Sequence, residues 1–255
     1  MSRLYMVVVA GTAVAALLGG GCRKGIDDQG QIGASVGEVM ASAGEAVAPA
    51  DLRFSACQDG VRTETFSNEA IGRATVDGSV TLAFSDRAGC QLAAAGDTVN
   101  RSADFTLTTP SGGALIVTSP GGGQTLTRTA SGFDFAVAGM ERMLIGARGA
   151  ALFDVSSETT TPLAISGSSP GDLTIASGSL VVTHHLAGYA VTLTPDNLAW
   201  NGHCTCAASG KLTGKVAGGH ADGESATVTI TGCGAAEVEI DGDTEPVTLD
   251  RCLTI

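Results

Sequence analysis

Hydrophobic and polar residues alternate in short runs over most of the chain, from Leu52 onward. The alternation is clearest near the C-terminus, in 227–231, 236–240 and 247–250, where every second residue is apolar. A period of two places alternate side chains on opposite faces of a strand, and one wet and one dry face is typical of antiparallel sheets. These segments therefore predict three strands that each bury one face.

Earlier runs rich in Thr, Val, Leu and Ile predict further strands. The candidate strands are 79–84, 104–108, 115–119, 133–138, 142–145, 152–155, 173–176, 180–186 and 189–194. Clusters of Gly, Pro, Ser, Asp and Asn predict turns at 110–113, 120–123, 168–171, 195–197, 218–219 and 241–243. The expected fold is all-β, an antiparallel meander that forms a sandwich or an open barrel.

Two six-residue segments resemble each other, DGSVTL at 77–82 and SGSLVV at 177–182. A single short match does not establish a repeat architecture. We interpret the two segments as hairpins built from the same turn chemistry.

The region 23–50 has a different character, with charged and small residues and no aromatic ones. Several apolar residues fall near helical spacing, namely Ile32, Val36, Val39, Ala43, Ala46 and Val47. Glycines at 33, 37 and 44 oppose a helix, since each costs about 1 kcal/mol relative to alanine. The pattern predicts a flexible tether with a short, weak amphipathic helix.

The first 22 residues combine a basic start, an uncharged apolar run at 4–18, three glycines at 19–21 and Cys22. This pattern predicts a secretory signal peptide, because the apolar run is too short for a stable membrane span. Small residues before a cysteine resemble the lipobox of bacterial lipoproteins. That resemblance implies a signal peptide at 1–21, a lipid-anchored tether at 22–50 that begins with acylated Cys22, and a β-rich domain at 51–255. Arg23, in place of aspartate, implies the outer membrane by the same resemblance.

With Cys22 assigned to lipid, six cysteines remain, namely Cys57, Cys90, Cys204, Cys206, Cys233 and Cys252. An even number in an exported chain predicts up to three disulfides. Sequence proximity favours Cys57–Cys90. A bond between Cys204 and Cys206 would be strained if they share one face of a strand. Cys204 then pairs with Cys233 and Cys206 with Cys252, or the partners are exchanged.

The alternative for these last four cysteines is a zinc site. Structural zinc prefers two cysteines separated by two to four residues, and C-x-C followed by lone cysteines fits that spacing poorly. An oxidising compartment further favours disulfides. No metal or other cofactor is expected.

Charge and composition exclude some classes of partner. The formal net charge is −12, and the chain contains only three lysines, so a nucleic-acid partner is not expected. Only 4% of the residues are aromatic, which argues against carbohydrate platforms and base-stacking grooves.

Other candidate chemistry is sparse. His184 and His185 are adjacent on a predicted strand and would face opposite sides, and His203 precedes Cys204. The G-x-S-x-G pattern occurs around Ser35 and Ser169, without the strand and helix that a hydrolase elbow needs. The acidic residues at 241, 243 and 245 form a short cluster that favours a hairpin turn over a calcium loop.

No catalytic residue is predicted. The expected function is therefore a non-enzymatic structural or interaction module of the bacterial cell envelope, anchored to a membrane through Cys22, with an envelope protein as a further partner. The alternatives are a periplasmic carrier of a lipid or other apolar ligand and, with less support, an exported hydrolase built around Ser169 or around a metal at His184 or His203.

Overall fold

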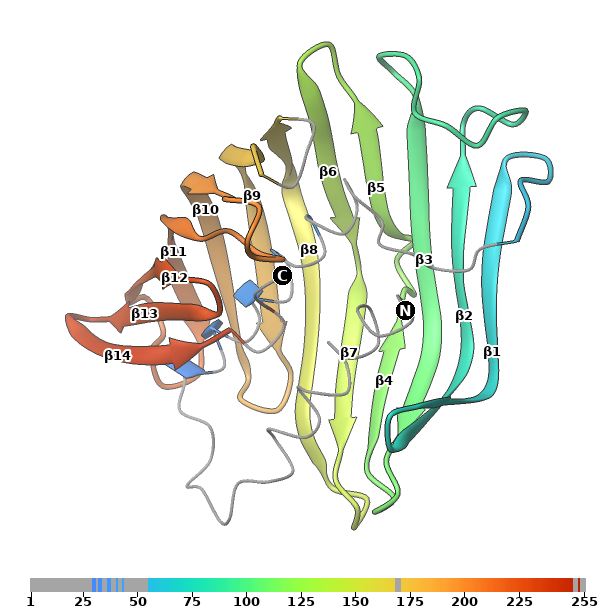
Figure 1. Cartoon of the computed structure of the whole chain (residues 1–255). Coiled ribbons are helices and arrows are strands. Elements are labelled where there is room, and N and C mark those ends of the chain that lie inside the picture. The colour runs from blue at the N-terminus through green and yellow to red at the C-terminus, as the bar shows by residue number, and fades with distance from the viewer. Residues whose placement is uncertain are drawn as a thin grey trace.

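The computed structural model describes residues 29–30, 32–33, 36–37, 40, 43, 55–167, 171–249 and 252. Within these residues, fourteen strands form one antiparallel sheet that curls without closing (Figure 1). The strands are β1 (Val61–Ile71), β2 (Ala74–Phe84), β3 (Thr98–Thr108), β4 (Ala114–Thr118), β5 (Gly123–Arg128), β6 (Gly132–Ala138), β7 (Met140–Ile145), β8 (Ala151–Ser166), β9 (Thr174–His184), β10 (Tyr189–Ala199), β11 (Ser209–Gly218), β12 (Ser225–Gly232), β13 (Ala235–Ile240) and β14 (Asp243–Thr248). The predicted all-β antiparallel meander is confirmed.

Two pairs of strands in the centre of the sheet lie end to end. Strand β3 pairs with β4 along one half and with β5 along the other. Strand β8 likewise pairs with β7 and then with β6. The chain therefore runs up and down the sheet in simple order, and β4–β5 and β6–β7 each act as one long strand with an interruption.

Side chains replace backbone hydrogen bonds at these interruptions. Ala103 N donates to Ser119 Oγ at 2.9 Å, and Asn100 Nδ2 donates to the carbonyl oxygen of Gly122 at 2.9 Å. On the other side, Val137 N donates to Thr159 Oγ1 at 3.0 Å. The breaks therefore cost few backbone hydrogen bonds, because hydroxyl and amide groups of neighbouring strands take the vacant positions.

Glycines inside the strands support the curl of the sheet. Gly78 in β2 and Gly178 in β9 have φ angles of 122° and 121°, a region that other residues rarely occupy. A Cβ on Gly78 would lie 2.2 Å from the carbonyl oxygen of Asp104. The resemblance between 77–82 and 177–182 thus marks two similar bends inside strands, and our interpretation of these segments as hairpins is wrong.

The predicted turn at 120–123 is present where β4 continues into β5, and Gly122 N donates to the carbonyl oxygen of Ser119 at 3.1 Å. The predicted turn at 195–197 is instead a bend inside β10, where the register with β11 shifts. Bulges and glycine bends increase the twist and curvature of a sheet. Sequence signals for turns and for strand bends use the same residues, which explains the error.

Most of the apolar strand residues point to the inner face of the curl and form one core. The helical residues Ile32, Val36, Met40 and Ala43 are buried in that core, each with an exposed fraction of 2% or less. The predicted amphipathic helix is therefore present between residues 29 and 43. It packs with the domain that was predicted to begin at residue 51, because its apolar side complements the inner face of the sheet.

The meander gives the sheet two distinct ends. We call one the turn end, formed by the connections 72–73, 109–113, 146–150, 185–188, 219–224 and 241–242. We call the other the disulfide end, because all six bonded cysteines lie in or beside the connections there. The turn end is at the bottom of Figure 1 for the central strands.

Candidate functional site

Three disulfides hold the disulfide end, and the prediction of disulfides is confirmed. Cys57 bonds to Cys90, as sequence proximity favoured. Of the two remaining arrangements, the structure has Cys204–Cys233 and Cys206–Cys252. No group of three or more metal-ligating side chains occurs among the described residues.

The local setting of two of these cysteines differs from the prediction. Cys204 and Cys206 lie in the connection between β10 and β11, not on one face of a strand. Both are fully buried, and Trp200 Nε1 donates a hydrogen bond to the carbonyl oxygen of Thr205 at 3.2 Å. The indole thus fixes the loop that presents the two sulfur atoms to different partners.

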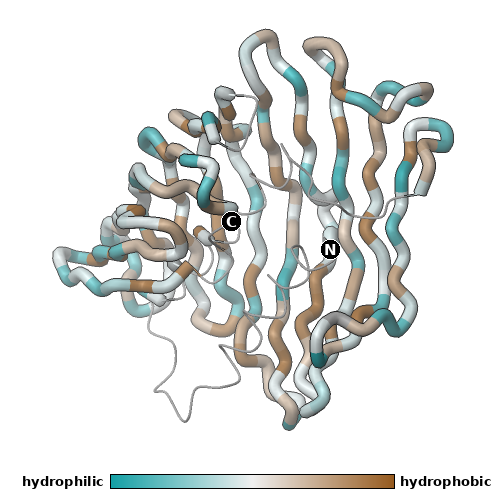
Figure 2. Tube along the Cα trace, in the orientation of Figure 1, coloured by the Kyte–Doolittle hydropathy of each residue, from teal (hydrophilic) through white to brown (hydrophobic). Residues whose placement is uncertain are grey.

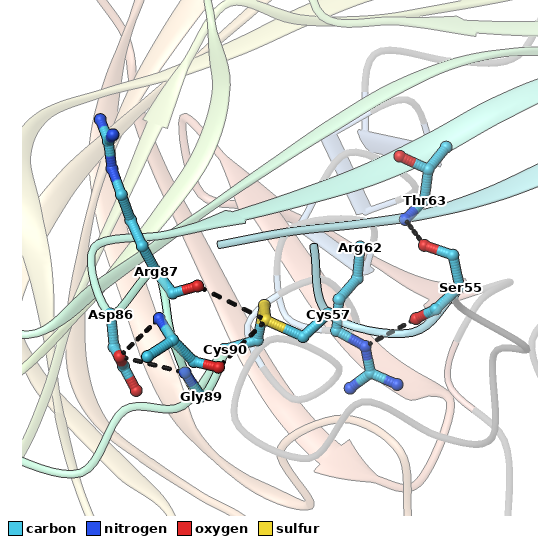
Figure 3. Close-up of a disulfide and its surroundings, with 9 residues drawn as sticks. Ser55, Cys57, Arg62, Thr63, Asp86, Arg87, Gly89 and Cys90 are labelled. Carbon is cyan, nitrogen blue, oxygen red and sulfur yellow. Dashed lines mark hydrogen bonds between the residues drawn. A yellow bond between two sulfur atoms is a disulfide. The ribbon is translucent and has the colours of Figure 1, made fainter. Parts of the chain in front are cut away.

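The Cys57–Cys90 disulfide fixes a short segment along the outer edge of β1 (Figure 3). Val61 N donates to the carbonyl oxygen of Gln58 at 2.9 Å, and Thr63 N donates to Ser55 Oγ at 3.0 Å. Ser55 N and Gln58 N donate in return to the carbonyl oxygens of Thr63 and Val61. The segment 55–58 therefore satisfies edge groups that would otherwise be open to another strand.

The helix meets the last strand through two glycines. A Cβ on Gly33 would lie 2.6 Å from Val247 Cγ2, and a Cβ on Gly37 would lie 3.2 Å from Leu249 Cβ. The carbonyl oxygen of Gly37 lies 3.8 Å from the sulfur of Cys206 and 4.0 Å from that of Cys252. The glycines that weaken the helix thus permit its close approach to the C-terminal segment.

Little space remains between the helix and the sheet. The cavity beside Val36, Met40 and Ala43 measures about 10 Å³, which is about what one water molecule needs. Leu163, Ile175, Leu180, Pro195, Leu198 and Leu212 form its other wall. This region is a packed core, and the helix occupies the position that an apolar ligand would need.

The inner face of β1–β7 is not uniformly apolar. Glu64, Arg101 and Arg142 occupy positions in register with buried Val80, Leu82 and Val117. These three side chains are each partly buried. Arg101 Nη1 donates to Gln124 Oε1 at 2.8 Å, and Gln124 is only 4% exposed. The sequence pattern alone did not single out these residues; the signal that could have found them is a charged residue at an inward-facing position of a strand.

The two adjacent histidines have different environments. His184 is 3% exposed; its ring stacks on Tyr189 with centroids 5.6 Å apart and meets the edge of Phe153 at the same distance. Its Nδ1 accepts a hydrogen bond from Ala187 N at 3.1 Å. His185 is exposed and contacts Ser156 Oγ. His184 thus shapes the turn after β9, and the two rings do not share one site.

The remaining candidates have simpler outcomes. His203 N donates to Asn201 Oδ1 in the loop that precedes Cys204. Asp241 and Gly242 have positive φ angles of 51° and 83°, as a two-residue hairpin turn requires, so the predicted turn is present. Cys22, Ser35 and Ser169 lie outside the described residues.

Among the residues that the structure describes, no helix is long and apolar enough to cross a membrane. Comparisons with protein-family models, with curated proteins and with solved structures found no match for this chain.

Proposed function

We propose that this protein is an exported lipoprotein of the bacterial envelope, anchored through acylated Cys22, with a rigid non-enzymatic body that serves as a structural or interaction module. The observation that carries the proposal is the use of cysteine. The three disulfides take six of the seven cysteines, and the seventh is Cys22, directly after the leader-like segment. Disulfides also indicate an oxidising compartment.

The packing of the body supports a structural role over a carrier role. The helix fills the inner face near β8–β11 and leaves a cavity of only about 10 Å³ beside it. Elsewhere on the inner face an apolar ligand would lie against the charged side chains of Arg101 and Arg142, and covering a guanidinium group with apolar surface removes its hydration, which is unfavourable. A carrier would have to displace the helix before it could bind a lipid.

The proposed anchor is tested by determining whether acyl groups are attached to Cys22. The full precursor is expressed in a Gram-negative host, and the mature protein is isolated from membranes and measured by denaturing mass spectrometry. We expect an N-terminus that begins at Cys22 and carries acyl chains. A Cys22→Ala variant keeps the six bonded cysteines and should lose the acyl mass and leave the membrane fraction. An unmodified Cys22 in the mature wild-type protein would refute the proposal.

Native mass spectrometry of the same detergent-extracted protein distinguishes the structural or interaction module from the lipid carrier. A body mass without a bound ligand supports the module. A lipid-sized adduct supports the carrier instead.

A further inference from the structure

The central strands are apolar on both faces close to the turn end. On the inner face, Leu115 and Leu144 belong to the core. On the outer face, Ile116 pairs with Met143, and Ile145 pairs with Ala114. Ile116, Met143 and Ile145 remain partly exposed. Figure 2 shows this as hydrophobic colouring on the lower ends of the central strands.

The apolar zone has a clear upper limit. The next outward-facing pair along β4 and β7 is Thr118 with Glu141, and Glu141 is exposed. Successive outward-facing rows of a sheet are about 7 Å apart. The outer apolar zone is therefore two rows deep on β4 and β7, measured from the turns, and Asp154 of β8 flanks the second row beside Met143.

Two of the most exposed large apolar side chains lie at the same end. Leu152 is 47% exposed and Leu186 is 52% exposed. His185 N donates to the carbonyl oxygen of Asp154, so both leucines lie at the turn end of two adjacent strands. Val61, which is 39% exposed, lies at the disulfide end and provides a comparison.

The charges of the two ends differ in sign over strands β1–β10. The four connections of the turn end at 72–73, 109–113, 146–150 and 185–188 contain Arg73 and Arg148 and no carboxylate. Both arginines are exposed. The segment before β1 and the connections at the disulfide end contain one cationic residue, Arg87, and four carboxylates, namely Asp59, Asp86, Asp97 and Asp172. Of the turn-end connections, only 219–224 and 241–242 contain carboxylates, and Asp154 in β8 lies beside the 185–188 connection.

The path of the chain brings the predicted acylation site to the same end. Ile32 lines a small space with Tyr189, Ala221 and Ile240, all beside turn-end connections. The helix thus starts at the turn end, and six residues, 23–28, separate Gln29 from Cys22. Such a segment spans at most about 25 Å.

We infer that the turn end lies on a bilayer surface, with Leu152 and Leu186 inserted between lipid headgroups and Arg73 and Arg148 facing anionic lipid. The inference rests on the proposed acylation of Cys22, which brings a bilayer close to this end. The two apolar rows match the depth of about 5–10 Å to which interfacial segments enter a membrane. Arginine beside an apolar tip suits an anionic surface.

The test measures how close each tip is to the acyl chains. Leu152→Trp, Leu186→Trp and the matched control Val61→Trp are made in the full precursor and purified in the mature form. Each is reconstituted into vesicles of phosphatidylethanolamine and phosphatidylglycerol with brominated acyl chains, which quench tryptophan at contact. The native Trp200 is 5% exposed at the disulfide end and gives a constant background.

We expect strong quenching of the Leu152→Trp and Leu186→Trp proteins and none beyond background for Val61→Trp. Equal quenching at all three positions, or none at either leucine position, in protein that carries acyl chains and floats with vesicles would refute the inference and leave the lipoprotein proposal intact. Protein that lacks acyl chains and does not float would refute both. A concentration-dependent blue shift of the Leu186→Trp emission without vesicles would assign this end to a second copy of the chain and would also refute it.

Discussion

Glycine has two opposite roles in this chain at the scale of single residues. In the helix, Gly33 and Gly37 reduce intrinsic helix stability but permit contact with Val247 and Leu249. In the strands, Gly78 and Gly178 supply φ angles that produce bends. The effect of replacing a glycine therefore depends on its neighbours rather than on helix or strand propensity.

The first prediction concerns Gly33. In an isolated helix, Gly33→Ala would stabilise by about 1 kcal/mol. Here the new methyl group would lie 2.6 Å from Val247 Cγ2, and we expect a net loss of about 1–3 kcal/mol from overpacking. Denaturant unfolding measures the change. Gly232→Ala is the control, because a Cβ there meets nothing within 4 Å. A stability gain for Gly33→Ala would show that the helix does not dock closely.

The second prediction compares two glycines with positive φ angles. A Cβ on Gly72, in a turn, meets nothing within 4 Å, whereas a Cβ on Gly78 would lie 2.2 Å from the Asp104 carbonyl oxygen. Gly72→Ala should cost only about 1–2 kcal/mol of backbone strain. Gly78→Ala should cost clearly more, because β2 and β3 must separate. Thermal unfolding of both variants checks the difference, and equal melting temperatures would contradict it.

At the scale of elements, the helix depends on the C-terminal segment. Gly37 lies close to both sulfur atoms of Cys206–Cys252, and Leu249 packs beside the same glycine. The Cys57–Cys90 bond holds a different part of the sheet, at the edge of β1. Loss of each disulfide should therefore have a local effect as well as the general loss of roughly 3–4 kcal/mol expected for loops of this size.

The third prediction uses this separation. A Cys206→Ala, Cys252→Ala double variant should accelerate amide hydrogen exchange in the helical residues between 29 and 43, because the surface beneath them loosens. A Cys57→Ala, Cys90→Ala double variant should leave exchange in the helix unchanged. Mass spectrometry of peptic fragments measures both. Equal acceleration in the two variants would mean that the helix responds only to global stability.

Sequence patterns located strands where one face is apolar and missed them elsewhere. Strands β12 and β13 alternate strictly and were predicted, whereas β1, β5 and β11 were not. Strand β1 is an edge strand with the polar run Thr63–Glu64–Thr65, and β11 presents Leu212 and Val216 four residues apart because a glycine occupies the inward position between them. Short-range periodicity cannot detect such strands, since their pairing partners determine them.

The helix contact could not be predicted for a related reason. The spacing of Ile32, Val36 and Ala43 indicated an apolar side, but nothing nearby in the sequence shows what covers it. Its partners Val247 and Leu249 lie more than two hundred residues away. The pairing of Cys57 with Cys90 was accessible from the sequence because the two lie only 33 residues apart.

At the scale of the whole molecule, an open sheet must protect two edges. At one edge, 55–58 bonds to Val61 and Thr63 at the start of β1. At the other edge, Asp241 N donates to the carbonyl oxygen of Ser225. This bond fixes which backbone groups of β13 and β14 point toward a neighbouring strand and which point away. The backbone nitrogen of Pro246 is one of those that point away from the sheet. Proline has no N–H, so it interrupts the row of donors on β14.

The fourth prediction is that Pro246→Thr promotes self-association through β14. Restoring an outward N–H completes the donor row of Thr244, residue 246 and Thr248. Analytical ultracentrifugation should detect dimers or larger species that the wild-type protein lacks at the same concentration. A Thr244→Pro change added to this variant returns a proline to the same edge and should restore the monomer. A monomeric Pro246→Thr protein would show that this edge is protected by other means.

The contact between the helix and the C-terminal segment also determines when this protein can finish folding. In the proposed export the N-terminus enters the oxidising compartment first, yet the helix rests on Val247, Leu249 and Cys252. The helix must therefore wait, without its binding surface, until almost the whole chain has crossed the membrane. Closing so long a separation in sequence is slow. During that interval Cys206 can meet Cys233 before Cys252 is available, so maturation should depend on an enzyme that rearranges disulfides.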